Sequence, residues 1–356
     1  MITVDNLKKQ NILDALSGAQ NIAIVSHVRP DHDAILSAIL IHNLITKYLK
    51  AGNNVKIIFE SEIEFSNEQY PGVNLAQSST DISSDLNNYD TAVFLDGDEL
   101  NRFSRNLTQE KLENLVSIRI DHHAFSSSMY THDISTREAV STTQLIYEYF
   151  LRDYELTPQE YEYILTGLLA DVGFFRYLLP TTYKVLVTVS EVLDKVFIDL
   201  GNIYVKLNSF SKNNFNAVKE LMNNTHFVDW NEDIANFSYS FIDNRNLNDT
   251  AGVYQNNILR LSQGYPWGFV AYWIDNSTVK ISFRALHRPD CPNVRELAKK
   301  LFNGGVHVGA SGASLNLDEA GIPKDVSLKK VCEYVVAKIK NNFNIVEKLK
   351  QKYEPT

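Results

Sequence analysis

Cysteine and long apolar runs are both scarce in this chain of 356 residues. Its two cysteines, Cys291 and Cys332, lie far apart in the sequence, so neither a disulfide framework nor a structural zinc site is indicated. No apolar run approaches the roughly 18 to 20 residues that a membrane-spanning helix needs, and the polar opening segment lacks the apolar core of a secretory signal. We therefore expect a cytoplasmic protein that does not associate with a membrane.

Positive charge is also in short supply, because 34 lysines and arginines face 43 aspartates and glutamates, giving a net charge of −9. A broad grip on long nucleic acid depends on many lysine and arginine contacts with phosphates. We therefore expect no binding to long DNA. Small anionic substrates remain compatible with this balance, because a bound metal attracts phosphate locally even where the surface as a whole repels it.

Apolar periodicity in the first half of the chain alternates between strand-like and helix-like patterns. We expect strands at 22–25, 55–59, 91–95 and 115–120, and helices at 7–16, 34–49 and across much of 141–196. The strands are compact apolar runs, as in parallel sheets that are buried on both faces. The sequence therefore predicts an α/β fold whose N-terminal domain is a doubly wound parallel sheet.

The pattern changes after about residue 236, where strand-like runs dominate. We expect strands at 237–242, 268–274 and 279–286, and helices at 294–302 and 328–340. These elements predict a smaller, mixed α/β domain. We place the N-terminal catalytic domain at 1–197, a linker at 198–216 and the C-terminal domain at 217–346.

Polar side chains follow three of the predicted strands, where the loops of a parallel sheet gather ligand-binding groups. They are His27, Asp31 and Asp33 after the first strand, Asp96 after the third, and Asp121, His122 and His123 after the fourth. The aspartates also have a simpler explanation, since this residue favours helix starts and solvated turns. Asp171 differs, because it lies in the apolar segment LLADVGFF, where a carboxylate without a partner would be costly to bury.

This donor set combines carboxylates and imidazoles without a thiolate, which favours Mn²⁺ or Mg²⁺ over zinc-thiolate or iron–sulfur chemistry. Two such ions roughly 3.5 to 4 Å apart can share a hydroxide, lower its pKa and stabilise both oxygens of an in-line displacement at phosphorus. The residue types therefore predict a two-metal phosphoesterase. Two Mn²⁺ ions are the expected cofactors, with Mg²⁺ as the alternative.

A glycine-rich segment in the second domain follows the strand that carries Arg284. It spans 303–312 and includes Gly304, Gly305, His307, Ser311 and Gly312. Glycines let a backbone approach an anion closely, and an arginine can bind a phosphate with two nitrogens. Taken alone, the segment has the composition of a flexible turn. In combination with Arg284 it favours a clamp that binds substrate.

The order of these motifs resembles the DHH phosphoesterase family, in its branch of nanoRNases and pAp phosphatases, over nearly the whole chain. The matching segments are 27–34, Asp96, 121–123, 166–177 and the stretch 284–312, which resembles the DHH-associated domain of that family. The order of the four N-terminal motifs is highly specific, whereas any single motif is not. Three positions depart from the common pattern, namely His32, Leu36 and Val306.

The resemblance implies a role for each candidate residue. One metal would be held by His27, Asp31 and Asp96, and the other by Asp33, Asp96, His122 and Asp171. His123 would face the substrate phosphate, and Asp121 would orient a histidine. Arg284, Gly305, His307 and Ser311 would bind the distal phosphate or terminal nucleotide, with Gly304 and Gly312 in the same segment. Arg102 and Arg176 are weaker candidates for phosphate contact.

The implied activity is hydrolysis of very short RNA oligonucleotides to nucleoside monophosphates, or of 3′-phosphoadenosine 5′-phosphate (pAp) to AMP. Linear dinucleotides such as pApA are further expected substrates, and a homodimer is the expected assembly. Two alternatives stay open: hydrolysis of polyphosphate or pyrophosphate, and a nucleotide-binding regulatory protein that keeps the metal site. Phe283, Tyr177 and Tyr272 are available for base stacking, although aromatic residues are also common in cores.

Overall fold

A computed structural model describes residues 2–63, 65–66, 68–123, 128–178, 182–209, 211–230, 235–243, 250–286, 288–304 and 309–349. The chain divides into two compact units, Met1–Leu207 and Asn208–Thr356. This division falls inside the segment 198–216 that we expected to link two domains. Much of that segment is helical, in α9 (Leu200–Asn208) and at the start of α10 (Lys212–Asn223).

The first unit is built on a six-stranded sheet in which every strand is parallel to its neighbours. The strands are β1 (Asn21–Ser26), β2 (Asn54–Phe59), β3 (Ala76–Ser78), β4 (Thr91–Leu95), β5 (Val116–Asp121) and β6 (His132–Ser135). Their order across the sheet is β3-β2-β1-β4-β5-β6. The expected doubly wound parallel sheet is confirmed, and the sequence pattern missed only its two short edge strands.

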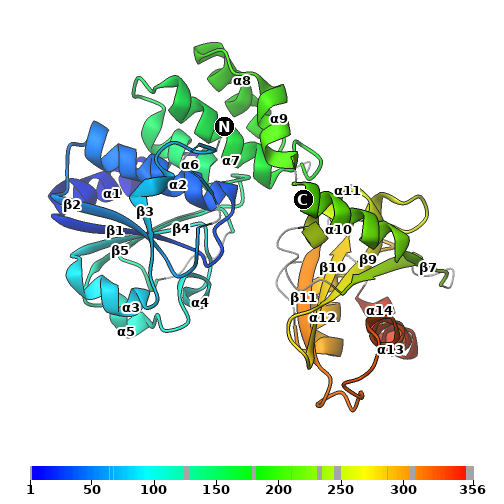
Figure 1. Ribbon diagram of the computed structural model, residues 1–356. Coiled ribbons are helices and arrows are strands. Elements are labelled where there is room, and N and C mark those ends of the chain that lie inside the picture. Colours follow the sequence, from blue (N-terminus) through cyan, green and yellow to red (C-terminus); the bar gives the residue numbers. More distant parts are fainter. Residues whose placement is uncertain are drawn as a thin grey trace. The chain divides into compact units, whose positions relative to one another are not determined.

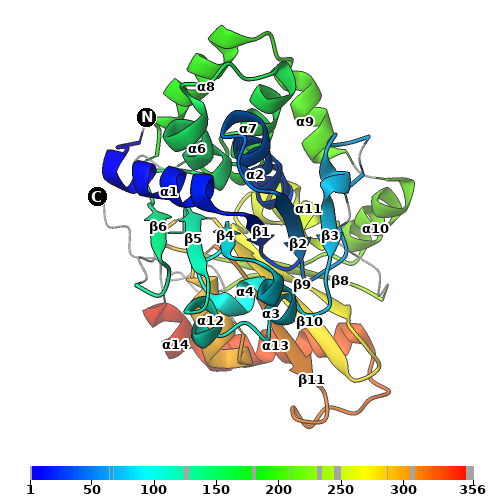
Figure 2. The ribbon, with the colours of Figure 1, turned by 90° about the vertical axis from the view of Figure 1, so that its left-hand side faces the viewer.

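Helices cover both faces of this sheet (Figures 1 and 2). Alternate residues of β1 face opposite ways, so Ile22 and Ile24 enter one core while Ala23 and Val25 enter another. The first core contains residues of α1 (Asn6–Gly18), α2 (His32–Asn43), α6 (Thr142–Ile146), α7 (Pro158–Asp171) and α8 (Val185–Lys195). The second contains residues of α3 (Ile82–Asp85), α4 (Leu100–Phe103) and α5 (Gln109–Leu112). Burial on both faces explains why the central strands are apolar throughout.

Local sequence accounts for the ends of the helices that carry site residues. Asp31 caps α2, and Ser141 caps α6 by accepting a hydrogen bond from a backbone amide. Thr157 and Glu160 form a capping box at the start of α7, with Pro158 as its first residue. Both α2 and α6 continue as π-helical turns, Leu44–Tyr48 and Tyr147–Leu151, so the helix expected over 34–49 is α-helical only to Asn43.

The order of the strands reverses at the centre of the sheet, where β1 lies between β2 and β4. In an open α/β sheet, ligands bind beyond the carboxyl ends of the strands at such a switch point. The loops that follow β1, β4 and β5 all leave the sheet at this edge. The polar clusters of the sequence are therefore brought to one place by topology alone.

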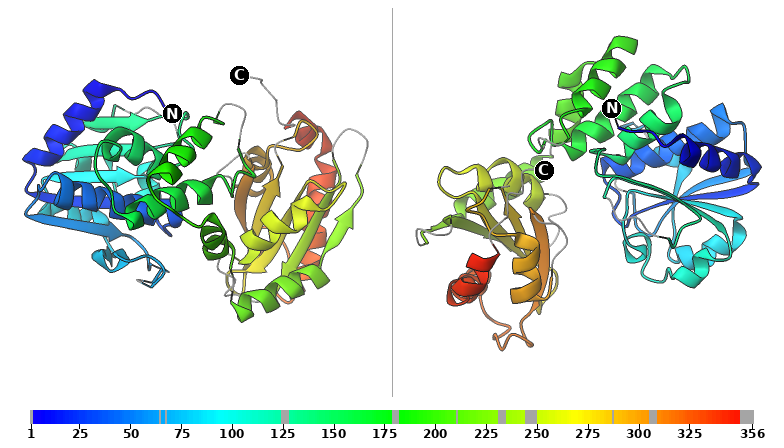
Figure 3. Two further views of the ribbon diagram at one scale, coloured as in Figure 1. Left: turned by 90° about the horizontal axis from the view of Figure 1, so that it is seen from above. Right: turned by 180° about the vertical axis from the view of Figure 1, so that it is seen from behind.

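The second unit is built on a five-stranded sheet of order β11-β10-β9-β8-β7, in which only the β8 and β9 pair is parallel. Its strands are β7 (His226–Val228), β8 (Phe237–Ile242), β9 (Trp267–Trp273), β10 (Thr278–Ala285) and β11 (Ala310–Asn316). On one face lie α10 and α11 (Thr250–Asn257), and on the other lie α12 (Val294–Phe302) and α13 (Leu328–Asn341), which is followed by α14 (Phe343–Lys348) (Figure 3).

Part of the segment expected to be a glycine-rich loop is a strand instead. Residues 310–316 form β11 and pair along β10, so Ser311 and Gly312 lie within the sheet. The strand was missed because its sequence, ASGASLN, lacks the β-branched and aromatic residues that usually mark strands. Gly305, Val306 and His307 lie outside the described residues.

No helix in the described part of the chain is both long and apolar enough to cross a membrane. Cys291 and Cys332 are both buried and both free, so the structure pairs neither of them in a disulfide. This agrees with their wide separation in the sequence.

Candidate metal centre

The loop after β1 supplies the first ligands. The Nδ1 atom of His27 lies 3.0 Å from the carbonyl oxygen of Val28, which leaves Nε2 to face the carboxylates. That Nε2 lies 3.8 Å from Asp31 Oδ2 and 3.5 Å from Asp96 Oδ2. Asp31 also accepts a hydrogen bond from the Ala34 amide at 3.0 Å. The capping role that the sequence allowed for Asp31 is therefore present, and its other oxygen still faces His27.

Asp96 occupies the middle of the site, directly after β4. Its backbone has φ +60°, in the left-handed region that costs a non-glycine residue about 1–2 kcal/mol. Its side chain is only 3% exposed. Oδ2 faces His27, whereas Oδ1 lies 3.3 Å from His122 Nε2. The unfavourable backbone thus aims one carboxylate between two histidines, as strained residues in functional sites often do.

Two histidines follow the buried Asp121 at the end of β5. Asp121 Oδ1 lies 2.6 Å from His123 Nδ1, so this carboxylate orients His123 by accepting a hydrogen bond. The rings of His122 and His123 have centroids 4.2 Å apart. His123 Nδ1 is also 3.9 Å from Asp96 Oδ1. Both histidines therefore lie beside the central carboxylate.

Asp171 is the last residue of α7, and its Oδ2 lies 3.2 Å from His122 Nε2. The chain then turns sharply. Gly173, Phe174 and Phe175 have φ values of +53°, +55° and +69°, so three successive residues adopt the left-handed conformation. This turn ends the helix immediately beyond the carboxylate.

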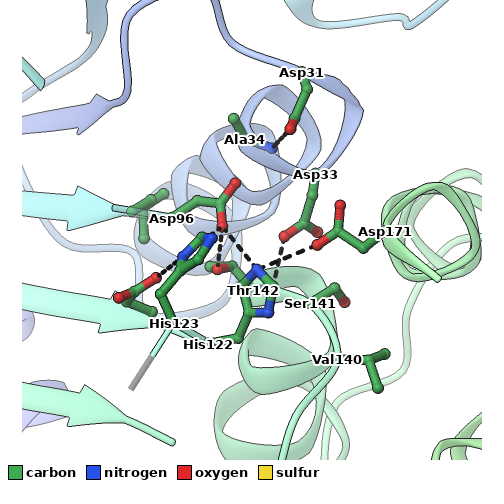
Figure 4. Close-up of polar contacts among 12 residues, drawn as sticks. Asp31, Asp33, Ala34, Asp96, His122, His123, Val140, Ser141, Thr142 and Asp171 are labelled. Atoms are coloured by element: carbon green, nitrogen blue, oxygen red, sulfur yellow. Dashed lines mark hydrogen bonds and ion pairs between the residues drawn. The ribbon is translucent and has the colours of Figure 1, made fainter. Parts of the chain in front are cut away.

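The six side chains expected to hold metal are brought together. Figure 4 shows five of them, Asp31, Asp33, Asp96, His122 and Asp171. His27, Asp31 and Asp96 form one set of donor atoms within 4.8 Å of one another, which we call the outer group. Asp33, His122 and Asp171 form a second such set, the inner group. A third set, Asp96, His122 and His123, overlaps both. Asp96 is a member of the outer group and also lies beside His122 of the inner group, as expected for a shared ligand.

Burial and mutual repulsion change the pKa values of the aspartates. Burial and the nearby charge of Asp96 raise the pKa of Asp33 to about 7. Burial and three neighbouring aspartates raise the pKa of Asp171 well above its usual range. These carboxyl groups therefore hold protons more tightly than exposed ones do, because the site concentrates negative charge.

The histidine pKa values move in the direction that this charge dictates. Burial by itself lowers the pKa of His27, but hydrogen bonds and charge interactions with Asp31 and Asp96 outweigh it and raise the value to about 10. For His122, burial is again outweighed, chiefly by Asp96, and the pKa rises to about 9. In the metal-free protein, protons thus supply positive charge that a divalent cation could supply instead.

The donor chemistry fits divalent cations of the Mn²⁺ or Mg²⁺ type, which accept carboxylate oxygen and, for Mn²⁺, imidazole nitrogen. The outer group would hold one ion, and the inner group together with Asp96 would hold the other. The described residues of the centre include no thiolate. The arrangement can therefore place two cations on either side of one carboxylate.

Two threonines at the start of α6 contact the ligands and were not predicted. The Thr142 amide donates to Asp33 Oδ2 at 2.6 Å, and its hydroxyl donates to Asp96 Oδ1 at 3.0 Å. The Thr143 amide and hydroxyl donate to Asp33 Oδ1 at 3.0 and 2.6 Å. The sequence signal, Ser-Thr-Thr before an apolar run, also fits ordinary helix capping and so did not single them out.

Gly167 on α7 permits this close packing. A Cβ atom at this position would lie 2.6 Å from Thr143 Oγ1 and 2.7 Å from Asp33 Oδ1. Neither atom can move freely, because each takes part in the hydrogen bonds just described. The glycine therefore lets α7 approach α6 and α2 closely enough for Asp171 to join the inner group.

The two weaker arginine candidates differ in their surroundings. Arg102 on α4 is partly buried and makes no ion pair with any described residue. Its carbonyl oxygen accepts a hydrogen bond from the Val28 amide at 2.8 Å, which fixes α4 beside the loop of the outer group. Arg176 Nε donates to the Gly173 carbonyl oxygen at 2.9 Å, so this side chain stabilises the left-handed turn.

The C-terminal candidates do not form one cluster among the described residues. Arg284 pairs with Gly268 and Ala310 across the sheet, whereas Ser311 pairs with Phe283 and is buried on the opposite face. The expectation that Phe283 is available for base stacking is wrong, because this ring is fully buried. Tyr177 and Tyr272 are only partly buried.

The glycines of this segment serve packing. A Cβ at Gly304 would lie 2.2 Å from the Gly312 carbonyl oxygen, so the chain after α12 approaches β11 closely. A Cβ at Gly312 would lie 3.5 Å from Lys280 Nζ, which places this ammonium group on the Arg284 face. Lys280 was not predicted, although it lies four residues before Arg284 on the same strand.

Comparison with known proteins finds a family model that matches the segment containing these residues. Residues 21–171 match the DHH family, N-terminal domain, and this segment contains all six residues of the outer and inner groups. No curated protein matches the sequence. This part of the chain is therefore similar to the N-terminal domain of the DHH family.

Solved structures support the fold. An exopolyphosphatase-related protein from Bacteroides fragilis is 22% identical with a TM-score of 0.75, over 97% of this chain and 99% of that chain. At this identity the similarity shows the common fold. A pGpG-specific phosphodiesterase from Vibrio cholerae is 10% identical with a TM-score of 0.39, over 91% of this chain and 100% of that chain, which is too weak to carry a conclusion.

Proposed function

We propose that this chain is a hydrolase that cleaves phosphate esters with two divalent cations, Mn²⁺ or Mg²⁺. The proposed substrates are very short RNA oligonucleotides, pAp and linear dinucleotides such as pApA. The products would be nucleoside monophosphates, including AMP from pAp. Phosphate ester hydrolysis is the part of this proposal supported by the match to the N-terminal domain of the DHH family, and the choice of substrate rests on the resemblance of the motifs.

The observation that carries the proposal is the convergence of the outer and inner groups on Asp96. Bound divalent cations would supply Lewis acidity, lowering the pKa of a water molecule and stabilising charge on the phosphate oxygens. The chain's own contribution is to orient the carboxylates and imidazoles before any ion arrives. The three hydrogen bonds to Asp33 and the strained backbone of Asp96 both serve this purpose.

His123 is the side chain that we assign to the substrate phosphate. Asp121 accepts a hydrogen bond from His123 Nδ1, which fixes the plane of the ring and leaves Nε2 as the atom that can give or receive a proton.

Arginines supply the remaining affinity for phosphate in this proposal. Arg102 is partly buried and makes no ion pair with a described residue, and a guanidinium can bind a phosphate with two nitrogens. Arg284 lies over small residues, Gly268 and Ala310, and its Nη1 donates to the Phe283 carbonyl oxygen at 2.9 Å. Its planar guanidinium is likewise the kind of group that binds a phosphate with two nitrogens.

Mn²⁺-dependent product release tests the proposal directly. The substrates would be 5′-labelled RNA from dinucleotides to longer oligomers, pAp, pyrophosphate and polyphosphate, with Asp96→Ala as the inactive control. Rapid cleavage of only the shortest RNAs and pAp is the expected result.

Each other outcome identifies one of the alternatives. Phosphate release from polyphosphate or pyrophosphate alone would reject the nucleotide substrates and keep the hydrolase. If Mn²⁺ raises thermal stability without turnover of any substrate, the protein is a nucleotide-binding regulator.

A further inference from the structure

Thr142 donates a hydrogen bond from its hydroxyl to Asp96, and its backbone amide also contacts the inner group. It is fully buried, so water does not compete for these contacts. The amide donates to Asp33 Oδ2 at 2.6 Å and the hydroxyl to Asp96 Oδ1 at 3.0 Å (Figure 4). A single residue thus connects the inner group with the central carboxylate.

The hydroxyl contact determines how the Asp96 carboxylate is rotated. Oδ2 of Asp96 faces His27 of the outer group, and Oδ1 faces His122 of the inner group. Rotation about the last side-chain bond would exchange or displace both oxygens, and terminal torsions of this kind are only weakly restricted on their own. A hydrogen bond to Oδ1 from a buried hydroxyl restricts that rotation.

We infer that Thr142 is a positioning residue that holds Asp96 Oδ2 toward the outer group and Oδ1 toward the inner group, and so would link the affinities of the two ions that these groups would hold. The inference rests on the proposed metal-dependent function. The group that positions Asp96 is the Thr142 hydroxyl. The contact of Thr142 with Asp33 is made by the backbone amide and is present with any side chain at this position.

Thr143 provides a contrast within the same helix turn. Its hydroxyl donates to Asp33 Oδ1 at 2.6 Å, and no described contact joins it to Asp96 or to the outer group. Loss of this hydroxyl should therefore weaken binding of the inner ion alone. Loss of the Thr142 hydroxyl should weaken binding of both.

The test is calorimetric titration of the metal-stripped full chain with Mn²⁺. Thr142→Val keeps the shape of the side chain and removes the hydroxyl, and it should weaken both binding steps by about 10- to 100-fold, as for other groups that orient metal ligands. Thr142→Ser restores the hydroxyl and should recover most of the affinity. Thr143→Val should weaken one step only.

Thr188→Val is the matched control. Thr188 is also fully buried, but its hydroxyl donates to Glu148, away from the metal centre. This variant should lose stability and keep the affinity of the wild type for both ions, which separates a general packing defect from an effect on the ligands. Circular dichroism would establish that every variant is folded.

Two results would overturn the inference. If Thr142→Val binds both ions as tightly as the wild type, or if Thr142→Ser is as weak as Thr142→Val, the hydroxyl does not position Asp96. A wild type that binds neither Mn²⁺ nor Mg²⁺ would instead reject the proposed function. The two failures are distinguishable because the first two results require a wild type that binds metal.

Discussion

The inner and outer groups differ in how completely the fold encloses their aspartates. Asp33 of the inner group is fully buried, and its carboxylate accepts three hydrogen bonds from Thr142 and Thr143. Asp31 of the outer group is 57% exposed in its side chain and accepts one from the Ala34 amide. The inner ligands are therefore positioned by the fold itself, whereas an outer ion would complete the arrangement of its own ligands.

The largest effect should come from Asp96, which belongs to the outer group and also contacts His122 of the inner group. Asp96→Asn removes the shared charge, and we expect loss of both ions and of all measurable turnover. Asparagine is preferable to alanine as a test because it tolerates the left-handed backbone of φ +60°. Calorimetric titration with Mn²⁺ and the hydrolysis assay measure the two losses. Normal binding of either ion would contradict the central place of Asp96.

Asp33→Ala and Asp31→Ala break the two groups separately. Asp33→Ala removes one inner ligand, so the variant should lose the inner ion. It also leaves three donors of α6 without their acceptor in a buried site, which should destabilise the fold by roughly 1–3 kcal/mol for each unsatisfied donor. Asp31→Ala should weaken the outer ion and cost about 1 kcal/mol as a lost helix cap. Chemical denaturation and Mn²⁺ titration would measure both; equal stability losses would refute the comparison.

Metal binding should depend strongly on pH. His122, with a pKa of about 9, and His27, with a pKa of about 10, are protonated at pH 7 in the metal-free protein. An ion must displace those protons, so affinity should rise with pH, by about tenfold per unit for each proton, and level off above the pKa concerned. Titration in buffers with different ionisation heats counts the protons released. Binding that does not change between pH 6 and 8 would refute this.

Gly167→Ala should affect the inner group more than the outer one. Its new Cβ would push against Asp33 and Thr143, and overpacking of this kind costs about 1–3 kcal/mol. We expect a lower free energy of unfolding and weaker binding of the inner ion. Gly18→Ala is the matched control, since a Cβ there meets no atom within 4 Å. Loss of the outer ion alone in Gly167→Ala would be inconsistent with the structure.

The smallest effect on the metals should come from the second unit. Arg284→Ala should raise KM for the short RNA and pAp substrates while leaving Mn²⁺ affinity unchanged, because Arg284 belongs to neither group. Arg288→Ala, which removes an arginine paired with Asp290, is the control. An unchanged KM in Arg284→Ala would reject its role in substrate binding.

Most candidate ligands of the two groups could be predicted because they lie in the loops that follow apolar strands. Asp171, at the end of α7, was instead predicted from its apolar sequence context. A buried run that ends in Asp96 or in Asp121-His122-His123 indicates both the strand and the edge of the sheet where it stops. The parallel order of the strands then brings these ends together. Prediction of the fold and of the ligands that follow strands therefore used the same signal.

The residues that orient the ligands could not be predicted in this way. Thr142 and Thr143 lie more than a hundred residues from Asp33 in the sequence, and their contact exists only because α6 packs against α2. The glycine-rich composition of 303–312 led to a wrong prediction of a flexible loop. Small residues fit a tightly packed strand such as β11 as well as they fit a loop. The local sequence alone does not distinguish a helix-capping threonine from one that orients a ligand, or a flexible loop from a tightly packed strand.

The left-handed turn at Gly173, Phe174 and Phe175 has a consequence for how the site becomes ordered. Two phenylalanines disfavour this conformation, so the turn depends in part on tertiary contacts, such as the edge-on packing of Phe174 against Tyr204 with ring centroids 5.2 Å apart. Asp171 is therefore anchored on one side by a helix and on the other by an aromatic contact from α9. Amide hydrogens of this turn should exchange with solvent as soon as that contact opens, and the inner group would then lose a ligand while the sheet stays intact.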